Sequence, residues 1–591
     1  MAAIPLKVKH AGKVYDIEVE PETTGEVLKM QLYSLTNVEP ENQKVMAKKL
    51  VKDDTTIASL NLKPGTQIML LGKPSAEVKF DMPTERMKFA EDMTEAELAK
   101  QEGATPAGLQ NTGNTCYANA TLQTLRAIPE LQQELRSYNP STSSAGPSNS
   151  SLFSPDQLAQ FGLGGLGGGN DLTSALRDLY DQMGQTQEGF PPIMFLTTLR
   201  QQFPQFAEKA KSGHGYAQQD AEEVWTSIVQ TLQQKLKLQD GADNAKKSWV
   251  DDFMGGQFEV TTKTEEALEE EPTTTKSEFL ALPCNIKVDT NHLREGISIA
   301  LNGELEKNSP TLGRNAVYKE TSRISRLPKY MPIHLLRFFW RKDTGKKAKI
   351  MRKVTFQHEI DVTEFCTEDL RKKLIPIRDR LREIRKEQED VERQKKRQKR
   401  MRVEAEQNGD DKVLSNEPLQ KRKEKEKERE LKAKGPASEG ELKEEKASAR
   451  ADEDTAMGGT EGEKFKSDEE IETERRAGIA ASKKELLSLV ASDLAKDKTA
   501  NQTGLYELRG VVTHQGASAD SGHYTAYVKK SATDGKTEDG KWWWFNDEKV
   551  QEVESEKIET LAGGGESHSA LILLYRAVEL PTLTPEEEKA A

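Results

Sequence analysis

The segment from about residue 370 to 500 most constrains the fold, because it carries too few apolar residues to build a core. It opens with a partial heptad that predicts a helix or a short coiled hairpin: Ile377, Leu381, Ile384 and Val391. The apolar stripe then ends, and basic blocks such as 393–400 and 421–427 follow. We therefore expect a charged, partly disordered insertion over about 375–500, with core-forming sequence on both sides. The basic blocks could also serve as a nuclear-import signal or contact an acidic surface.

The composition limits the class of protein. The chain has 591 residues, 31% charged and 35% hydrophobic, with a formal net charge of -12. The length indicates several domains, and the negative charge argues against a general nucleic-acid binder. No signal-like start and no bilayer-spanning apolar run is visible, so we expect a soluble protein of the cytoplasm and nucleus. Cys116, Cys284 and Cys366 are far apart and form no CxxC pair, so we expect no disulfide framework, no metal and no cofactor.

Shifts in composition and pattern predict the domain boundaries. A linker is predicted over 75–103. It contains Thr94 followed by Glu97, a capping signature that predicts a short helix. The predicted parts are a first domain over 1–74, a linker over 75–103, a large domain over 104–577 with a flexible Ser/Gly-rich insertion near 139–170, and a C-terminal tail over 578–591.

The first 74 residues carry the patterns of a small compact domain. Two alternating runs predict a hairpin, then a helix follows with Val27, Met30, Ser34 and Leu35 on one face, and two further strands lie at 44–46 and 67–71. In order and size, these elements resemble ubiquitin, and the resemblance implies the β-grasp fold. The chain continues beyond the last strand, so the domain cannot be conjugated, and the resemblance implies a built-in binding module. Its recognition surface would lie on three residues, which could alternatively just complete the small core: Met46, Met69 and Leu71.

The stretch 108–120 brings a cysteine to the start of a helix. Gly and Asn residues favour a turn up to Thr115, and a helical pattern follows through Ile128. Cys116 is therefore expected where unpaired N–H groups and the helix dipole favour a thiolate over a thiol, which makes a nucleophile. A buried structural thiol is the alternative, and the position alone does not decide between them.

The C-terminal part predicts a meander of three antiparallel strands, at 506–514, 523–528 and 542–545. His514 ends the first strand, and His523 begins the second after a polar loop. Asn546 and Asp547 follow the third. A cysteine nucleophile needs a base and a group that orients this base, so these residues are candidates for both roles. A structural histidine is equally compatible with the spacing.

Three sets of residues stand out as motifs: the box at 111–119, the run at 218–223, and the pair His514…521–524 with 544–547. Together they resemble the motifs of the ubiquitin-specific proteases, papain-like cysteine hydrolases that release ubiquitin. The resemblance runs from 108 to about 576 and implies an α+β chain, in which the β-grasp domain precedes a papain-like domain with fingers, palm and thumb. The N-terminal domain and the segments 91–94 and 309–312 make it most similar to the proteasome-associated subtype.

The resemblance implies a role for each matching residue. Cys116 matches the nucleophile, His523 the base and Asn546 the group that orients the base, with Asp547 as a second candidate. His514 is left as a structural or loop residue. Asn111 matches a side-chain donor to the oxyanion, beside the backbone N–H of Cys116. Three residues match positions near the ubiquitin tail, where carboxylates suit its arginines: Gln219, Asp220 and Tyr524.

The resemblance also implies a function. We expect a deubiquitinase that cleaves the (iso)peptide bond after the last glycine of ubiquitin and recycles ubiquitin from proteasome substrates. Its expected partners are ubiquitin, polyubiquitin conjugates and, through the N-terminal domain, the proteasome regulatory particle, with no nucleic acid and no membrane. The loop 516–521 would block the ubiquitin tail, so basal activity would stay low until the proteasome binds. The alternative is a non-catalytic, ubiquitin-binding regulator, but such a protein would be expected to lack Cys116 or His523.

Overall fold

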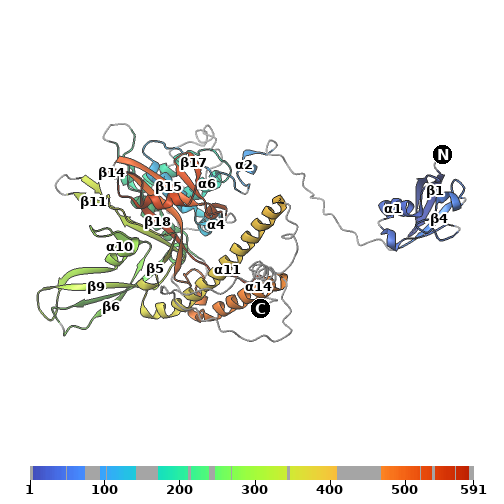
Figure 1. Ribbon diagram of the computed structural model, residues 1–591. Coiled ribbons are helices and arrows are strands. Elements are labelled where there is room, and N and C mark those ends of the chain that lie inside the picture. Colours follow the sequence, from blue (N-terminus) through green and yellow to red (C-terminus); the bar gives the residue numbers. More distant parts are fainter. Residues whose placement is uncertain are drawn as a thin grey trace, which may run out of the picture. The chain divides into compact units, whose positions relative to one another are not determined.

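The computed structural model describes residues 4–36, 38–47, 49–60, 62–72, 93–101, 103–140, 171–210, 215–238, 247–267, 269–341, 346–408, 468–518, 521–534, 539–565 and 567–584. The chain separates into two compact units, Met1–Asp92 and Met93–Ala591, each of which is described by itself (Figure 1). Most of the predicted Ser/Gly-rich insertion and the centre of the charged insertion lie outside the described residues. Among the described helices, none has the length and apolar character needed to span a bilayer.

The first unit is a β-grasp domain, as predicted. Its elements are β1 (Ile4–His10), β2 (Lys13–Val19), α1 (Gly25–Thr36), β3 (Lys44–Met46) and β4 (Gln67–Leu71). The sheet order is β2-β1-β4-β3, and β1 runs parallel to β4. Leu6 and Val8 of β1 alternate with exposed residues and pack with Leu28 and Leu32 of α1, so a period-2 strand and a helix share one core.

Helix α1 packs on this core through a different face from the one that the sequence pattern groups together. Its buried residues are Gly25, Leu28, Leu32 and Thr36. Gly25 fixes this face, because a Cβ there would lie 2.1 Å from the Lys52 carbonyl oxygen. The four residues that the sequence places together on one face are exposed, so that face does not contact the core: Val27, Met30, Ser34 and Leu35.

The predicted recognition surface of this unit is exposed. Met46, Met69 and Leu71 are 41%, 48% and 51% exposed, and Leu50 is 50% exposed. Met46 pairs with Met69 across β3 and β4, so these side chains form one apolar patch on the sheet. They do not complete the core, which excludes the alternative interpretation of their role.

A sheet of eight strands organises the second unit. Its strands are β7 (Leu282–Asn285), β10 (Tyr330–Leu336), β13 (Glu359–Asp361), β14 (Leu505–Ser518), β15 (Ser521–Lys529), β16 (Trp542–Asn546), β17 (Lys549–Val553) and β18 (Ser569–Ala577). The order is β17-β16-β15-β14-β18-β10-β7, with β13 on β14. The antiparallel meander β14-β15-β16 was predicted and is confirmed. Both faces are buried: Leu574 of β18 packs in one core and Leu573 in the other.

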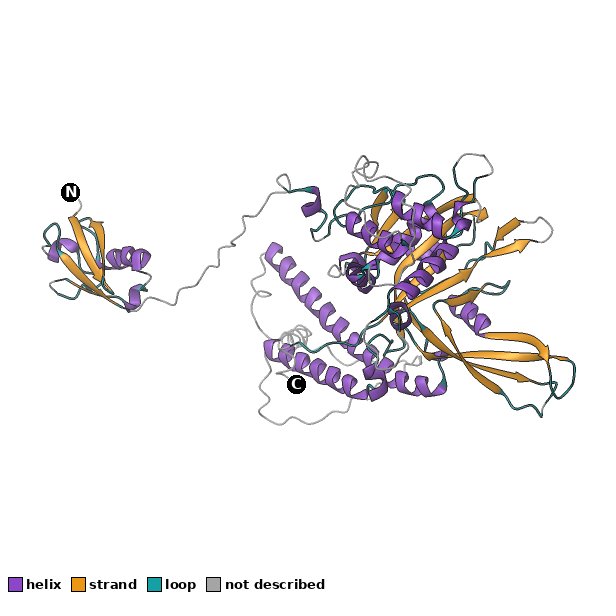
Figure 2. Ribbon diagram, turned by 180° about the vertical axis from the view of Figure 1, so that it is seen from behind, coloured by secondary structure: helices purple, strands orange, loops and turns teal. Residues whose placement is uncertain are grey.

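Helices cover one face of this sheet (Figures 1 and 2). They are α3 (Cys116–Arg126), α4 (Pro129–Ser137), α6 (Leu172–Met183), α7 (Ile193–Gln202), α8 (Ala221–Lys235) and α9 (Trp249–Phe253). Helix α3 packs against β15 and β14 and, on its other side, against α8. Its residues from Cys116 to Leu125 are all buried, which places the predicted nucleophile inside the layer between helices and sheet.

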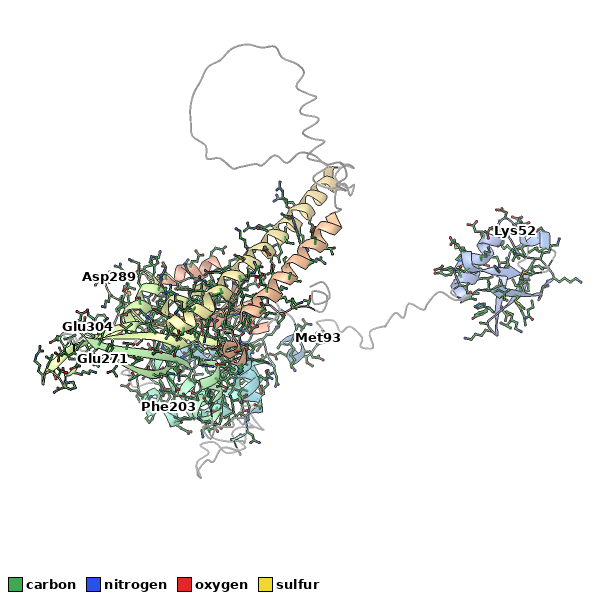
Figure 3. The ribbon with its side chains drawn as sticks, turned by 90° about the horizontal axis from the view of Figure 1, so that it is seen from below. Lys52, Met93, Phe203, Glu271, Asp289 and Glu304 are labelled. Atoms are coloured by element: carbon green, nitrogen blue, oxygen red, sulfur yellow. The ribbon has the colours of Figure 1, made fainter. Side chains whose placement is uncertain are left out.

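A second sheet extends from this core. Its strands β5 (Gly256–Thr264), β6 (Thr273–Phe279), β8 (Asn302–Asn308) and β9 (Asn315–Arg326) pair in the order β6-β5-β9-β8, and α10 (Leu293–Leu301) precedes β8. The side chains of Glu271 and Glu304 are exposed on this extension (Figure 3). A separate hairpin follows β10 and consists of β11 (Phe338–Arg341) and β12 (Lys346–Lys349).

The two described ends of the charged insertion form a helical hairpin. Helix α11 (Glu368–Asn408) and α14 (Asp468–Leu489) lie side by side (Figures 1 and 2). At the root of the hairpin, Ile377, Leu381 and Ile384 pack with Leu486, as the partial heptad predicts. Beyond the root, α11 is mostly exposed and carries the basic block 393–400. Short helices complete the unit: α2 (Glu95–Leu98), α15 (Ser492–Lys496), α16 (Lys530–Asp534) and α17 (Glu556–Glu559). The predicted cap of α2, Thr94 with Glu97, is present.

Candidate active site

A side-chain-stabilised turn places Cys116 at the first position of α3. Asn111 Oδ1 accepts from the backbone N–H of Gly113 at 3.0 Å and from that of Thr115 at 3.2 Å. Gly113 and Asn114 have positive φ angles of 107° and 53°, which Gly and Asn tolerate best. The turn therefore depends on the residue types that the sequence provides between Asn111 and Thr115.

Burial dominates the chemistry of the Cys116 thiol. The side chain is 2% exposed, and this desolvation raises its pKa to about 11, assisted by the Asp547 charge. Backbone N–H groups of Tyr524, Tyr117 and Cys116 act in the opposite direction but are weaker. The expected thiolate is therefore not the resting form at neutral pH, because burial outweighs the helix start. A base must take the proton before the sulfur can attack.

The strand β15 presents His523 to the end of β16. His523 Nε2 lies 2.6 Å from Asn546 Oδ1, and the pairing of Ala526 with Phe545 sets this register. An amide oxygen only accepts, so Nε2 carries the proton and Nδ1 is left as the basic nitrogen. Since Cys116 receives a hydrogen bond from the backbone of Tyr524, the residue next to His523, the thiol and the imidazole belong to one site.

Asp547 joins the loop before α3 to the end of β16. Its Oδ2 accepts from Asn111 Nδ2 at 2.9 Å, and its Oδ1 accepts from Asn119 Nδ2 at 2.8 Å. It lies 4.0 Å from His523 Nε2, too far for a hydrogen bond, and its φ angle is 52°. Of the two predicted orienting residues, Asn546 contacts the imidazole, while Asp547 holds Asn111 and Asn119.

Asn119 is a site residue for which the sequence reasoning assigned no role. Its amide also bonds the carbonyl oxygens of Leu109 and Gln110, each at 3.3 Å, so one buried side chain holds the loop from inside. The available signal was its place within the 111–119 box, three residues after the cysteine. In an α-helix, such a residue lies on the same face as the cysteine.

His514 lies in the interior, apart from the exposed part of the site. It is fully buried, and its ring contacts Phe338 and Tyr524 at centroid distances of 5.4 and 4.6 Å. Burial and the charge of Lys349 lower its pKa to about 3, so it is neutral at physiological pH. It therefore has a structural position, which is one of the two options, structural or loop, that the resemblance left for it.

The three predicted substrate-binding residues come from two elements near the thiol. Asp220 caps α8, because its Oδ1 accepts from the Glu222 N–H at 3.0 Å. Tyr524 is buried, and burial raises its pKa, with a further contribution from the Asp220 carboxylate. Gln219 directly precedes Asp220 and is half-buried.

Over the residues that the structure describes, no group of three or more His, Cys, Asp or Glu side chains is placed to hold a metal ion. At the tip of the second sheet, hydrogen bonds to the Glu270 carboxylate connect the segment before β6 with the β8–β9 hairpin. The hydroxyls of Ser309 and Tyr318 donate to it, and so does the Thr311 N–H at 3.3 Å. The other cysteines, Cys284 and Cys366, are free and buried.

A buried cysteine at a helix start, together with a histidine held by an asparagine on a neighbouring sheet, is the arrangement of a papain-like thiol hydrolase. Comparisons with known proteins agree. Residues 107–575 match the model of the ubiquitin carboxyl-terminal hydrolase family, and residues 6–75 match that of the ubiquitin family. The chain belongs to the ubiquitin carboxyl-terminal hydrolase family.

Several relatives match over nearly the full length. The chain is 37% identical to ubiquitin carboxyl-terminal hydrolase 6 of Schizosaccharomyces pombe over 98% of this chain and 99% of the relative. It is 34% identical to ubiquitin carboxyl-terminal hydrolase 7 of Arabidopsis thaliana over 97% and 99%. It is 28% identical to ubiquitin carboxyl-terminal hydrolase 14 of Caenorhabditis elegans over 98% and 95%. The protein is thus a deubiquitinating thiol protease with an N-terminal ubiquitin-like domain.

Proposed function

We propose that Cys116 is the nucleophile of this deubiquitinase, that His523 is its base and that Asn546 orients the base. The observation that carries this assignment is the 2.6 Å contact between His523 Nε2 and Asn546 Oδ1, which leaves Nδ1 to take the thiol proton. The sulfur then attacks the carbonyl carbon of the last glycine of ubiquitin, and the imidazolium returns the proton to the leaving amine. Water hydrolyses the resulting thioester, with His523 again as the base.

The oxyanion of the tetrahedral intermediate needs donors at the start of α3. The backbone N–H of Cys116 is one such donor. Asn111 is proposed as the other, because its amide carries two hydrogens and Asp547 accepts only one of them at 2.9 Å. Asp547 thereby fixes the orientation of Asn111, which is what a preorganised donor requires. Gln219, Asp220 and Tyr524 are proposed to line the path of the ubiquitin tail.

Hydrolysis of a fluorogenic ubiquitin C-terminal reporter tests this assignment. Cys116→Ala and His523→Ala should each abolish turnover while leaving the thermal unfolding midpoint close to that of the wild type. Retained turnover in either variant would refute the assignment. Wild-type protein without any activity, with and without proteasomes, would instead support the alternative of a non-catalytic, ubiquitin-binding regulator.

We further propose that the ubiquitin-like domain docks on the proteasome regulatory particle and that docking raises a low basal activity. The apolar patch of Met46, Leu50, Met69 and Leu71 supports this, because a contiguous apolar patch on a small polar domain is typical of a docking surface. The same deubiquitinase would then recycle ubiquitin from substrates at the proteasome.

A matched pair of surface variants tests the docking proposal. Leu71→Glu should abolish co-purification with proteasomes and the rise in turnover that added proteasomes cause. Met30→Glu places the same charge on the α1 face, where Met30 is 60% exposed, and should change neither. Full co-purification of Leu71→Glu would overturn the proposal, as would turnover that does not respond to added proteasomes.

A further inference from the structure

A buried lysine connects the β11–β12 hairpin to the strand that supports the catalytic histidine. Lys349, the last residue of β12, is 6% exposed. Its Nζ donates to the His514 carbonyl oxygen at 2.7 Å and lies 3.3 Å from His514 Nδ1. A lysine is rarely buried to this extent, because desolvation disfavours its charge, and here burial lowers its pKa to about 8. No acidic side chain is among the partners that the structure gives this ammonium.

The contact between Lys349 Nζ and His514 Nδ1 fixes the tautomer of His514. An ammonium group only donates, so Nδ1 of His514 must accept, and its proton must sit on Nε2. Nε2 faces the chain at Ser521 and Gly522: a Cβ at Gly522 would lie 2.7 Å from it. Nε2 itself is buried and has no hydrogen-bond partner among the described residues, so the ring meets Gly522 by packing. One nitrogen thus contacts the hairpin, and the other contacts the start of β15.

This chain of contacts ends at the proposed base. Across β14 and β15, His514 pairs with Tyr524 and Gln515 pairs with His523. The register shifts between Gln515 and Ser518, and Gly516 and Gly522 have φ angles of 125° and 127°. Backbone hydrogen bonds alone therefore fix the pairing of β14 with β15 less firmly at this end than in its middle. The His514 ring lies against this end of the strand pair, because a Cβ at Gly516 would lie 3.3 Å from His514 Cε1.

We propose that Lys349 and His514 form a positioning pair, in which Lys349 fixes the His514 tautomer so that His514 supports the irregular turn before His523 and keeps the catalytic imidazole in register. The inference rests on the proposed role of His523. Lys349 touches neither the thiol nor the substrate and acts through His514, while Arg337 anchors the hairpin independently. The Arg337 guanidinium donates to the carbonyl oxygens of Ala570 and Arg352 at 2.8 and 2.7 Å.

Steady-state kinetics of the full chain with the ubiquitin reporter test the pair. Lys349→Met keeps the length of the side chain and removes the donor, and we expect kcat to fall at least tenfold with KM within twofold. The alkylation rate of Cys116 by iodoacetamide, read by mass spectrometry, should fall in parallel, because this reaction needs the base but no ubiquitin. Lys349→Arg retains a donor and should be at least threefold more active than Lys349→Met.

Lys530→Met is the matched control. Lys530 is also buried, at 9% exposed, but its Nζ pairs with Glu552 at 2.6 Å, away from His514. This variant should lower the unfolding midpoint and leave kcat within twofold. A Lys349→Met protein with wild-type kcat and alkylation would overturn the proposal, whatever its unfolding midpoint, and so would equal activity of the Arg and Met variants.

Variants at His514 decide the question if Lys349→Met does not fold. Asn can place its oxygen where Nδ1 lies, whereas Leu has no polar atom, so His514→Asn should be at least tenfold more active than His514→Leu. Equal activities of the two would overturn the proposal. His523→Ala separates this outcome from a failure of the proposed function, since an active His523→Ala enzyme would reject His523 as the base without reference to Lys349.

Discussion

Replacing Asn546 by Ala isolates the contact that we propose orients the catalytic imidazole. His523 Nε2 donates to Asn546 Oδ1 over 2.6 Å, and this bond strengthens when the imidazole becomes charged during the reaction. A hydrogen bond to a charged group contributes about 1.5–3 kcal/mol. At about 1.4 kcal/mol for each tenfold change in rate, Asn546→Ala should lower kcat/KM about 10- to 150-fold.

Kinetics of the reporter under single-turnover and steady-state conditions measure this loss. Asn546→Asp keeps an acceptor at the same place and should recover most of the activity. Lys549→Ala is the control, because Lys549 pairs with Asn546 across β16 and β17 and is exposed, so its loss should change kcat/KM by less than twofold. Asn546→Ala activity within twofold of the wild type would refute the reasoning. The 4.0 Å separation of Asp547 from His523 would then have to shorten during catalysis.

Three further predictions concern pH and packing. Burial is the main cause that lowers the pKa of His514 to about 3 and that of His568 to about 4, so between these values and about pH 6.5 the two side chains take up protons only on unfolding. The free energy of unfolding should therefore fall as the pH drops through this range, by up to about 1.4 kcal/mol per pH unit for each histidine. In urea titrations, His514→Asn should show a shallower dependence on pH. The pKa of about 11 for Cys116 predicts that its alkylation in His523→Ala rises with pH up to about 11, and a plateau below pH 9 would contradict the role given to burial. Leu486 is fully buried at the root of the α11–α14 hairpin, so Leu486→Ala should cost about 2–5 kcal/mol in denaturant unfolding, whereas Leu487→Ala, at a 38% exposed position, should cost less than about 1 kcal/mol.

The sequence predicted those parts of the site that local chemistry determines. The Gly113–Asn114 turn and the helix after Cys116 follow from residue types with strong backbone preferences, and the meander follows from period-2 alternation. The resemblance to a known family then supplied candidate partners from distant segments. The resemblance ranked Asn546 before Asp547, but it did not show the positive φ angle of Asp547 or the hydrogen bonds of its carboxylate to Asn111 and Asn119.

Features that depend on packing between distant segments were not predictable. The close approach of Gly25 to the Lys52 carbonyl determines which face of α1 packs on the core, and no sequence pattern links these two residues. Likewise, the helix start at Cys116 suggested a thiolate, but burial beneath β15 raises the pKa of the thiol instead. A local sequence pattern does not show how strongly tertiary packing will desolvate a side chain.

The Asn111–Asp547 hydrogen bond spans 436 residues of sequence, and this separation has a consequence for synthesis. At about 5–20 residues per second, a ribosome needs roughly 20–90 s to pass from the first of these residues to the second. During that interval, the nascent chain carries a cysteine but has no imidazole beside it. The proposed set of Cys116, His523 and Asn546 is therefore complete only when the last strands have been made, and chains that stall earlier should not hydrolyse a ubiquitin reporter.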